Sequence, residues 1–71
     1  MKLFVIESLV RPGVWHPVNL REGTFKDVLA GAQARMGLCV RVKRVKTPAE
    51  RDRFDHLPTD TPSIEAIEWV N

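Results

Sequence analysis

The stretch KLFVIESLV, residues 2–10, decides the fold that this sequence predicts. Leu, Phe, Val and Ile favour strands, and successive side chains of a strand point to opposite faces. One face of such a strand carries Leu3, Val5 and Leu9, and the other carries Phe4, Ile6 and Val10. Apolar side chains on both faces are typical of a strand that is buried in the middle of a sheet. We therefore expect residues 2–10 to form a central strand.

A turn and a second strand follow this stretch. Arg11-Pro12-Gly13 is typical turn sequence, because Pro fixes φ and Gly accepts positive φ. Residues 14–18 then predict a strand that completes a hairpin. Pro17 lacks a backbone N–H for the ladder, so we expect this strand at an edge of the sheet.

The strongest local signal predicts a helix over residues 25–36. Thr24 is a good N-cap with Asp27 three residues later, and Gly37 is a typical helix stop. The apolar residues fall at helical spacing on one stripe: Phe25, Val28, Leu29, Ala32 and Met36. The stripe should pack on one face of the sheet, with Gly31 allowing close approach.

Residues 38–46 predict a third strand, since Val and basic residues alternate there. The alternation slips at residues 43–45, which indicates a β-bulge or the end of the strand. Thr47-Pro48-Ala49-Glu50 then combines an N-cap, Pro at the first helical position and Glu at the third. We expect a helix of about two turns that reaches Phe54 or Asp55 and ends before Leu57-Pro58.

The C-terminal residues 64–70 fit both a helix and a strand. Ile64, Ile67 and Val70 have helical spacing, whereas Ile67 and Trp69 alternate as on a strand face. We favour a strand, because Ile, Trp and Val favour sheets. The fold class is then a small α+β domain of order ββαβ(α)β, mainly antiparallel, with sheet order 2-1-3, a C-terminal strand and one main helix on one face. The opposite face is either covered by the short helix and tail or offered to a partner.

Length and composition predict one globular domain over residues 1–71, with 44% hydrophobic and 28% charged residues. The single cysteine excludes an internal disulfide and indicates a reducing compartment. The first apolar run ends at Glu7, which is too early for a signal peptide or a membrane span. We therefore expect a cytoplasmic protein without a membrane partner.

Charge is distributed unevenly along the chain, although the net charge is only +2. Residues 35–46 contain five basic residues and no acidic one, whereas residues 54–71 contain acidic residues and no Lys or Arg. These stretches either pair within the fold or present two faces of opposite sign.

Residues that could support catalysis are few and separated. Asp52 and His56 have the i, i+4 spacing of a base and its orienting group, but a metal site would need further ligands. Cys39 could pair with His16 or His56 as a nucleophile, yet its place at the start of an apolar strand predicts a buried structural thiol. We expect a non-enzyme without a metal or a cofactor.

Binding residues are expected in the edge strand and the basic strand. Trp15 and Trp69 either close the small core or anchor an interface, and Trp15 fits the second role better because of its place in an edge strand. The residues that we expect to contact a protein partner are Trp15, His16, Arg41, Lys43 and Arg44. The residues that would contact a nucleic acid instead are Arg35, Arg41, Lys43, Arg44, Lys46, Arg51 and Arg53.

The leading functional hypothesis is a small non-enzymatic protein-binding module. The hairpin with its Gly13-Val14-Trp15 start, the helix and the Arg41-Val42 strand resemble, in size and style, small accessory proteins encoded by phages and prophages. That resemblance implies a protein that docks on a host enzyme or regulator and inhibits or modulates it. The alternatives are a nucleic-acid-binding module and a homodimer formed through edge strands.

Overall fold

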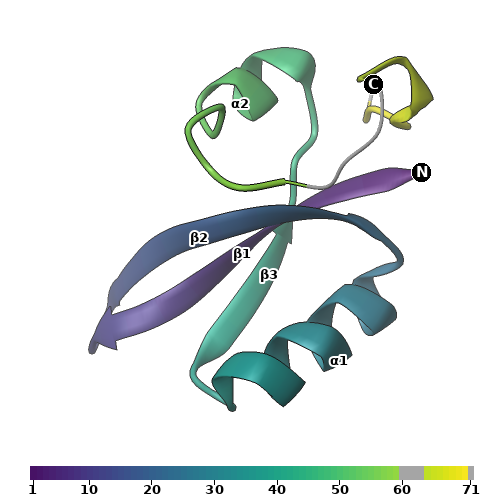
Figure 1. Ribbon diagram of the computed structural model, residues 1–71. Helices are drawn as coiled ribbons and strands as arrows, with labels where there is room; N and C mark the ends of the chain where they lie inside the picture. The colour runs from purple at the N-terminus through teal and green to yellow at the C-terminus, as the bar shows by residue number, and fades with distance from the viewer. Residues whose placement is uncertain (60–63, 71) are drawn as a thin grey trace.

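The computed structural model describes residues 1–59 and 64–70 (Figure 1). Its elements are β1 (Lys2–Arg11), β2 (Val14–Gly23), α1 (Phe25–Met36), β3 (Val40–Arg44), α2 (Pro48–Asp52) and the short 3-10 helix η1 (Ile64–Ala66).

The three strands form one sheet of order β2-β1-β3, with β1 antiparallel to both neighbours. Val5 lies opposite Leu20 of β2 on one side and opposite Lys43 of β3 on the other. The predicted α+β class, sheet order and central position of β1 are confirmed. Because β2 and β3 run in the same direction, the chain crosses from one to the other through α1.

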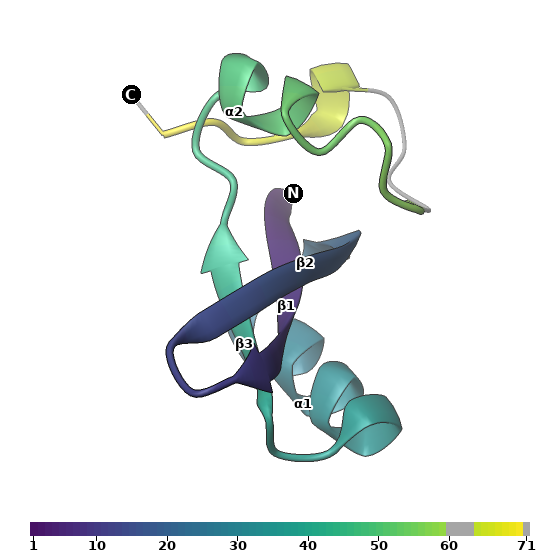
Figure 2. The same ribbon diagram turned by 90° about the vertical axis from the view of Figure 1, so that its left-hand side faces the viewer.

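Two hydrophobic clusters lie on opposite faces of the sheet. On the α1 face the buried residues are Phe4, Ile6, Val28, Ala32, Val40 and Val42. On the other face they are Leu3, Val5, Leu20, Val45 and Ile67, with Phe54, Leu57 and Trp69 packed against them. α1 and α2 lie at opposite ends of the molecule in both views, and α2 and the C-terminal segment lie near the start of β1 (Figures 1 and 2). Both apolar faces of β1 are therefore buried, one against α1 and the other against the α2 and C-terminal segments.

The predicted caps are present at both helices. Thr24 accepts a hydrogen bond from the Asp27 amide at 3.2 Å, and Gly37 ends α1 with φ of 80°. Thr47 accepts from the Glu50 amide at 3.1 Å and starts α2. α2 stops at Asp52, short of the predicted Phe54 or Asp55. The backbone there changes to i to i+3 hydrogen bonds, such as Phe54 N–H to the Arg51 carbonyl at 2.9 Å, so the chain continues as turns.

The outer strands differ in length from the prediction. β2 extends to Gly23 and not only to Val18, because a bulge between Ile6 and Glu7 leaves Val18 outside the register and shifts the side-chain alternation. β3 covers only Val40–Arg44, so the slip in its pattern marks the end of a strand. Gly31 does not serve close packing, since a Cβ at this position would meet nothing within 4 Å.

The predicted strand over residues 64–70 is wrong. After η1 the chain lies across the ends of two strands, where Glu68 N–H donates to the Met1 carbonyl at 2.6 Å and Val70 N–H donates to the Lys46 carbonyl at 2.9 Å. Because these bonds go to two different segments, no continuous ladder forms. Ile67 is still buried and Trp69 still packs on the core, so the alternation is used for packing without a strand.

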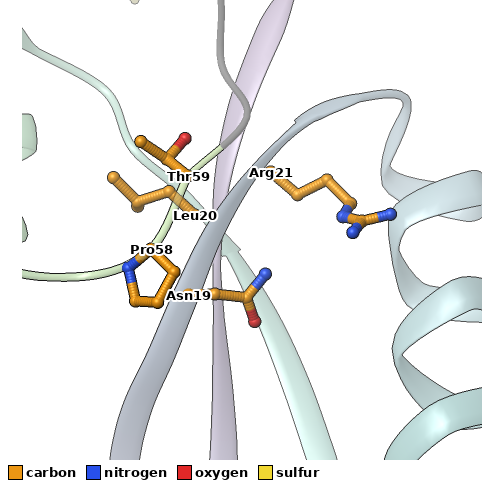
Figure 3. Close-up of a pocket in the computed structure, with 5 residues that line it drawn as sticks. All are labelled: Asn19, Leu20, Arg21, Pro58 and Thr59. Atoms are coloured by element: carbon orange, nitrogen blue, oxygen red, sulfur yellow. The ribbon is translucent and has the colours of Figure 1, made fainter.

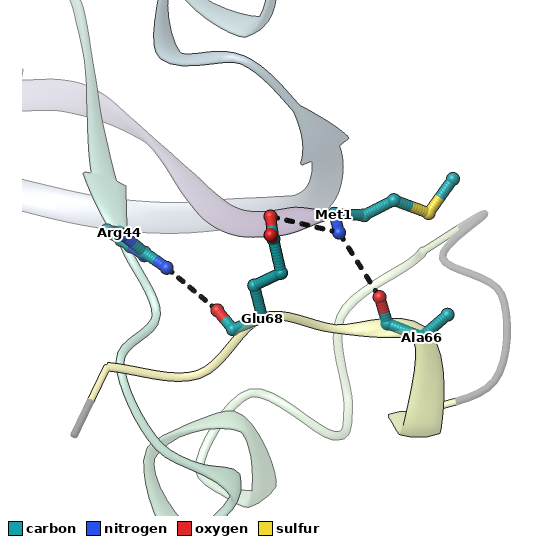
Figure 4. A network of polar contacts seen from close by, with 4 residues as sticks. All are labelled: Met1, Arg44, Ala66 and Glu68. Atoms are coloured by element: carbon teal, nitrogen blue, oxygen red, sulfur yellow. Dashed lines mark hydrogen bonds and ion pairs between the residues drawn. The ribbon is translucent and has the colours of Figure 1, made fainter.

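Side-chain contacts hold this segment in place (Figure 4). The amino-terminal ammonium of Met1 lies 3.1 Å from the Glu68 carboxylate and donates to the Ala66 carbonyl at 3.2 Å. Arg44 donates through Nη2 to the Glu68 carbonyl at 2.8 Å. The ammonium, which donates to the carboxylate, lowers the pKa of Glu68 below its ordinary value of 4.5.

None of the described helices is both long enough and apolar enough to cross a membrane.

Candidate functional site

On the face opposite α1, all three strands change from apolar to polar residues at about the same level. Leu3 and Val5 of β1 are followed on this face by Glu7, and Val45 beyond β3 is preceded by Lys43 and Arg41. β2 has buried Leu20 at the covered end of this face. The change marks the boundary of the layer formed by α2 and the C-terminal segment.

Beyond that boundary lies a part of the sheet that we call the open half-face. It consists of Glu7 and Leu9 of β1, Trp15 and Pro17 of β2, and Arg41 and Lys43 of β3. The register places Glu7 opposite both Pro17 and Arg41, and Leu9 opposite Trp15. Within the described part of the chain, none of these six residues belongs to either hydrophobic cluster.

Arg41 is the centre of the open half-face. Its Nε donates to Glu7 Oε1 at 2.7 Å, and its guanidinium carbon lies 4.5 Å from the centre of the Trp15 ring. The three residues come from the three strands, so the Arg41 side chain extends over β1 from one outer strand to the other. A charge-assisted hydrogen bond and a cation–π contact together fix the guanidinium in one orientation.

Exposure differs among these three side chains. The Glu7 side chain is 12% exposed, that of Arg41 is 42% exposed, and Trp15 is half-buried. Within the described part of the chain, the terminal nitrogens of Arg41 donate to no other residue. They can therefore form a bidentate pair with a carboxylate or bind a carbonyl of a partner, next to an aromatic ring that is already in place.

The five residues expected to contact a protein are divided between the two faces. Trp15, Arg41 and Lys43 share the open half-face. His16 and Arg44 lie opposite Ser8 and Phe4, on the side of the sheet that carries α1. Arg44 also holds the C-terminal segment through its bond to the Glu68 carbonyl, so it contributes to the fold.

The seven residues expected to contact a nucleic acid lie on several segments and not along one line. Arg41, Lys43 and Arg44 belong to β3, Lys46 follows β3, Arg35 is in the last turn of α1, Arg51 is in α2 and Arg53 follows α2. Two of them have carboxylate partners, since Arg51 lies 3.1 Å from Asp55 and Arg41 lies 2.7 Å from Glu7. These pairs reduce the positive charge that could meet phosphate.

The sequence did not identify Glu7 as a member of the site. It is the carboxylate that pairs with the basic stretch, whereas Glu68 of the acidic stretch pairs with the amino terminus. An acidic residue in an otherwise apolar central strand was the available signal, because a nearly buried carboxylate requires a partner. The partner itself depends on the register of β1 against β3, which the sequence does not show.

The structure changes the setting of the residues that the sequence singled out for catalysis. Cys39 is exposed, so the prediction of a buried thiol is wrong; it lies in the connection before β3 and not within the strand. α2 ends at Asp52, so His56 does not follow Asp52 on one helix face. Among residues 1–59 and 64–70, no group of three or more His, Cys, Asp or Glu is placed to hold a metal ion.

Two pockets lie away from the open half-face. One of about 250 Å³ is lined by Asn19, Leu20, Arg21, Pro58 and Thr59, where Leu20 N–H donates to the Pro58 carbonyl at 3.1 Å (Figure 3). Leu20 and Arg21 point to opposite sides of β2, and Arg21 points toward α1 (Figure 3). The other, of about 320 Å³, is lined by Met1, Lys2, Gly23, Thr24, Asp27 and Glu68. Neither lining includes a residue of the open half-face.

Comparisons with protein-family models, with curated proteins and with solved structures found no match to this chain.

Proposed function

We propose that this protein is a non-enzymatic binding module that docks on another protein through the open half-face. The observation that carries the proposal is the Arg41 guanidinium, held between the Trp15 ring and the Glu7 carboxylate. Trp and Arg are the residues that most often dominate binding energy at protein interfaces. A contact residue that is already fixed loses little conformational entropy when a partner arrives.

The same arrangement supports a protein partner over a nucleic acid. The Trp15 ring, which a base would need for stacking, already contacts Arg41. The positive charge of Arg41 is partly neutralised by Glu7. The open half-face also contains Leu9 and Pro17, which suit a mixed apolar and polar interface better than a phosphate backbone.

The biological role that we propose is modulation of a cellular protein. The resemblance to phage and prophage accessory proteins in size and style suggests that the target is a host enzyme or regulator, which the module inhibits or redirects. The single cysteine, which excludes an internal disulfide, supports a cytoplasmic location.

The experiment that tests the proposal is affinity capture with three forms of the protein. The wild type, Trp15→Ala and Lys26→Ala are immobilised and exposed to a nuclease-treated lysate, then washed with salt. Lys26 is an exposed residue of α1 and serves as the control for surface substitution. Circular dichroism establishes that each variant is folded before capture.

We expect a stoichiometric protein that is retained by the wild type and by Lys26→Ala and is lost with Trp15→Ala. Equal retention by all three forms would place docking elsewhere on the molecule. Capture that disappears with nuclease or modest salt would favour nucleic acid, since phosphate contacts weaken steeply as the salt concentration rises.

A further inference from the structure

Among residues 1–59 and 64–70, the outer edge of β3 presents backbone groups without partners. Leu9 N–H donates to the Cys39 carbonyl at 3.0 Å and Val45 N–H donates to the Leu3 carbonyl at 2.9 Å. In an antiparallel ladder the backbone groups of alternate residues point to the same side. The backbone groups of Cys39, Arg41, Lys43 and Val45 therefore face β1, and those of Val40, Val42 and Arg44 face away from it.

The other edge of the sheet is protected. Leu20 N–H of β2 is bonded to the Pro58 carbonyl, and Pro17 has no N–H to offer. Beyond the end of β3, the Lys46 carbonyl accepts from Val70 N–H. Among the described residues no segment pairs with Val40–Arg44 on the outer side, where β3 forms the border of the sheet (Figure 1). The β2 edge is thus interrupted at Pro17 and covered at Leu20, whereas no described segment covers the β3 edge between Val40 and Arg44.

The charge of β3 decides what can pair there. Three of its five residues are Arg41, Lys43 and Arg44, and the Glu7 carboxylate pairs with the first of them. A second copy would place β3 against β3, with basic residues opposite each other in every central register. Pairing around Val42 places Arg41 opposite Lys43, and a shift of the register by two places Arg41 opposite Arg41 or Lys43 opposite Lys43. Like charges directly opposite are destabilising.

We propose that the outer edge of β3 accepts an extended acidic segment of a partner protein, of about the length of the five-residue strand. This inference rests on the proposed docking function and names the partner's chemistry. Acidic side chains on one face of the added strand meet exposed Lys43, whereas Arg41 is directed over β1 toward Trp15. The backbone supplies affinity, and the charges select an acidic strand over a second copy.

The test uses a synthetic seven-residue peptide, acetyl-Thr-Glu-Val-Glu-Val-Glu-Thr-amide. Two controls accompany it: the same peptide with Lys in place of Glu, and the acidic peptide N-methylated at its three central residues, which keeps its charge and loses the backbone donors of those three residues. Binding to the ¹⁵N-labelled protein is followed by amide chemical shifts and by hydrogen exchange. Lys43→Glu and the control Lys26→Glu change the net charge equally, at β3 and at exposed α1 respectively.

We expect the acidic peptide alone to bind, with the largest shifts and slowed exchange at the amides of Val40, Val42 and Arg44. Lys43→Glu should weaken binding about fivefold, and Lys26→Glu by less than about twofold. Lys43→Glu should also promote a dimer in sedimentation experiments, because it removes the like charge at position 43 that opposes pairing of β3 with β3 of a second copy.

Three results would overturn the inference. These are equal binding of the N-methylated peptide, shifts confined to residues outside β3, and no binding of the acidic peptide. Each of them leaves the proposed function intact if Trp15→Ala still abolishes capture from a lysate. If the acidic peptide does not bind and Trp15→Ala does not reduce capture from a lysate, the proposed docking function is wrong as well.

Discussion

Replacing Arg41 with Ala should destabilise the fold by about 2 kcal/mol. The substitution leaves Glu7, whose side chain is 12% exposed, without its hydrogen-bond donor. A hydrogen bond to a charged group contributes about 1.5–3 kcal/mol when buried, and the 42% exposure of the Arg41 side chain reduces this to about 1 kcal/mol. Loss of the contact with Trp15 adds about 0.5–1 kcal/mol.

This loss is large for a chain of 71 residues, whose total stability is expected to be roughly 4–11 kcal/mol. Urea unfolding, monitored by circular dichroism and tryptophan fluorescence, measures it. The melting temperature should fall by roughly 10 °C. Lys43→Ala is the matched control, since Lys43 is an exposed neighbour on the same strand and should cost less than about 0.5 kcal/mol.

A double-mutant cycle separates the ion pair from general effects on β3. Glu7→Gln should cost little in the Arg41→Ala background, because the carboxylate that it removes no longer has a partner. The coupling free energy between the two substitutions should be about 1 kcal/mol. A coupling below about 0.3 kcal/mol would refute the reasoning, because Arg41 and Glu7 would then act independently in the folded protein.

Five further substitutions, one of them a control, test the core, the helix and the C-terminal contact. Ile6→Ala, which empties a fully buried site between β1 and α1, should cost about 3 kcal/mol in urea unfolding, whereas exposed Val10→Ala should cost less than about 0.5 kcal/mol. Gly31→Ala should stabilise by about 0.5–1 kcal/mol and Gly37→Ala should destabilise by about 1 kcal/mol; both sites have room for a Cβ, but Gly37 alone of the two has positive φ. The pKa of Glu68 is lowered, so the stabilisation by its carboxylate is complete above pH 4.5 and is lost as the pH falls through the lowered pKa. Glu68→Gln should therefore make the stability of the protein less dependent on pH in the acid range. An unchanged pH dependence would show that the ion pair with the amino terminus does not stabilise the fold.

Local signals in the sequence were sufficient for the elements that form by local interactions. α1 has the predicted bounds because Thr24 and Gly37 act within their own turns and the apolar stripe is continuous. The central place of β1 followed from its two apolar faces, and the sheet order followed from the crossover through α1.

Features that depend on long-range pairing were missed. The bulge at Val18 shifted the alternation of β2, so its second half did not resemble a strand. The C-terminal segment has strand-like alternation at Ile67 and Trp69, but its backbone partners, Met1 and Lys46, belong to different segments. The same limit explains the site: Trp15 and Arg41 were expected to bind, but their contact with each other and with Glu7 requires the register of all three strands.

The residues of the open half-face are suited to exposure, so this surface is not simply a part of the core that a short chain fails to cover. If the exposed end of the sheet were only uncovered, its residues would continue the apolar pattern of Leu3, Val5 and Val45. They change instead to Glu7, Lys43 and Arg41 at the place where α2 and the C-terminal segment no longer cover the sheet. A polar pattern that coincides with the limit of the cover keeps this surface compatible with water in the free protein. The Trp15 ring, stacked with Arg41 at this level, is then the one aromatic side chain of the open half-face, and its placement there is what the docking proposal explains.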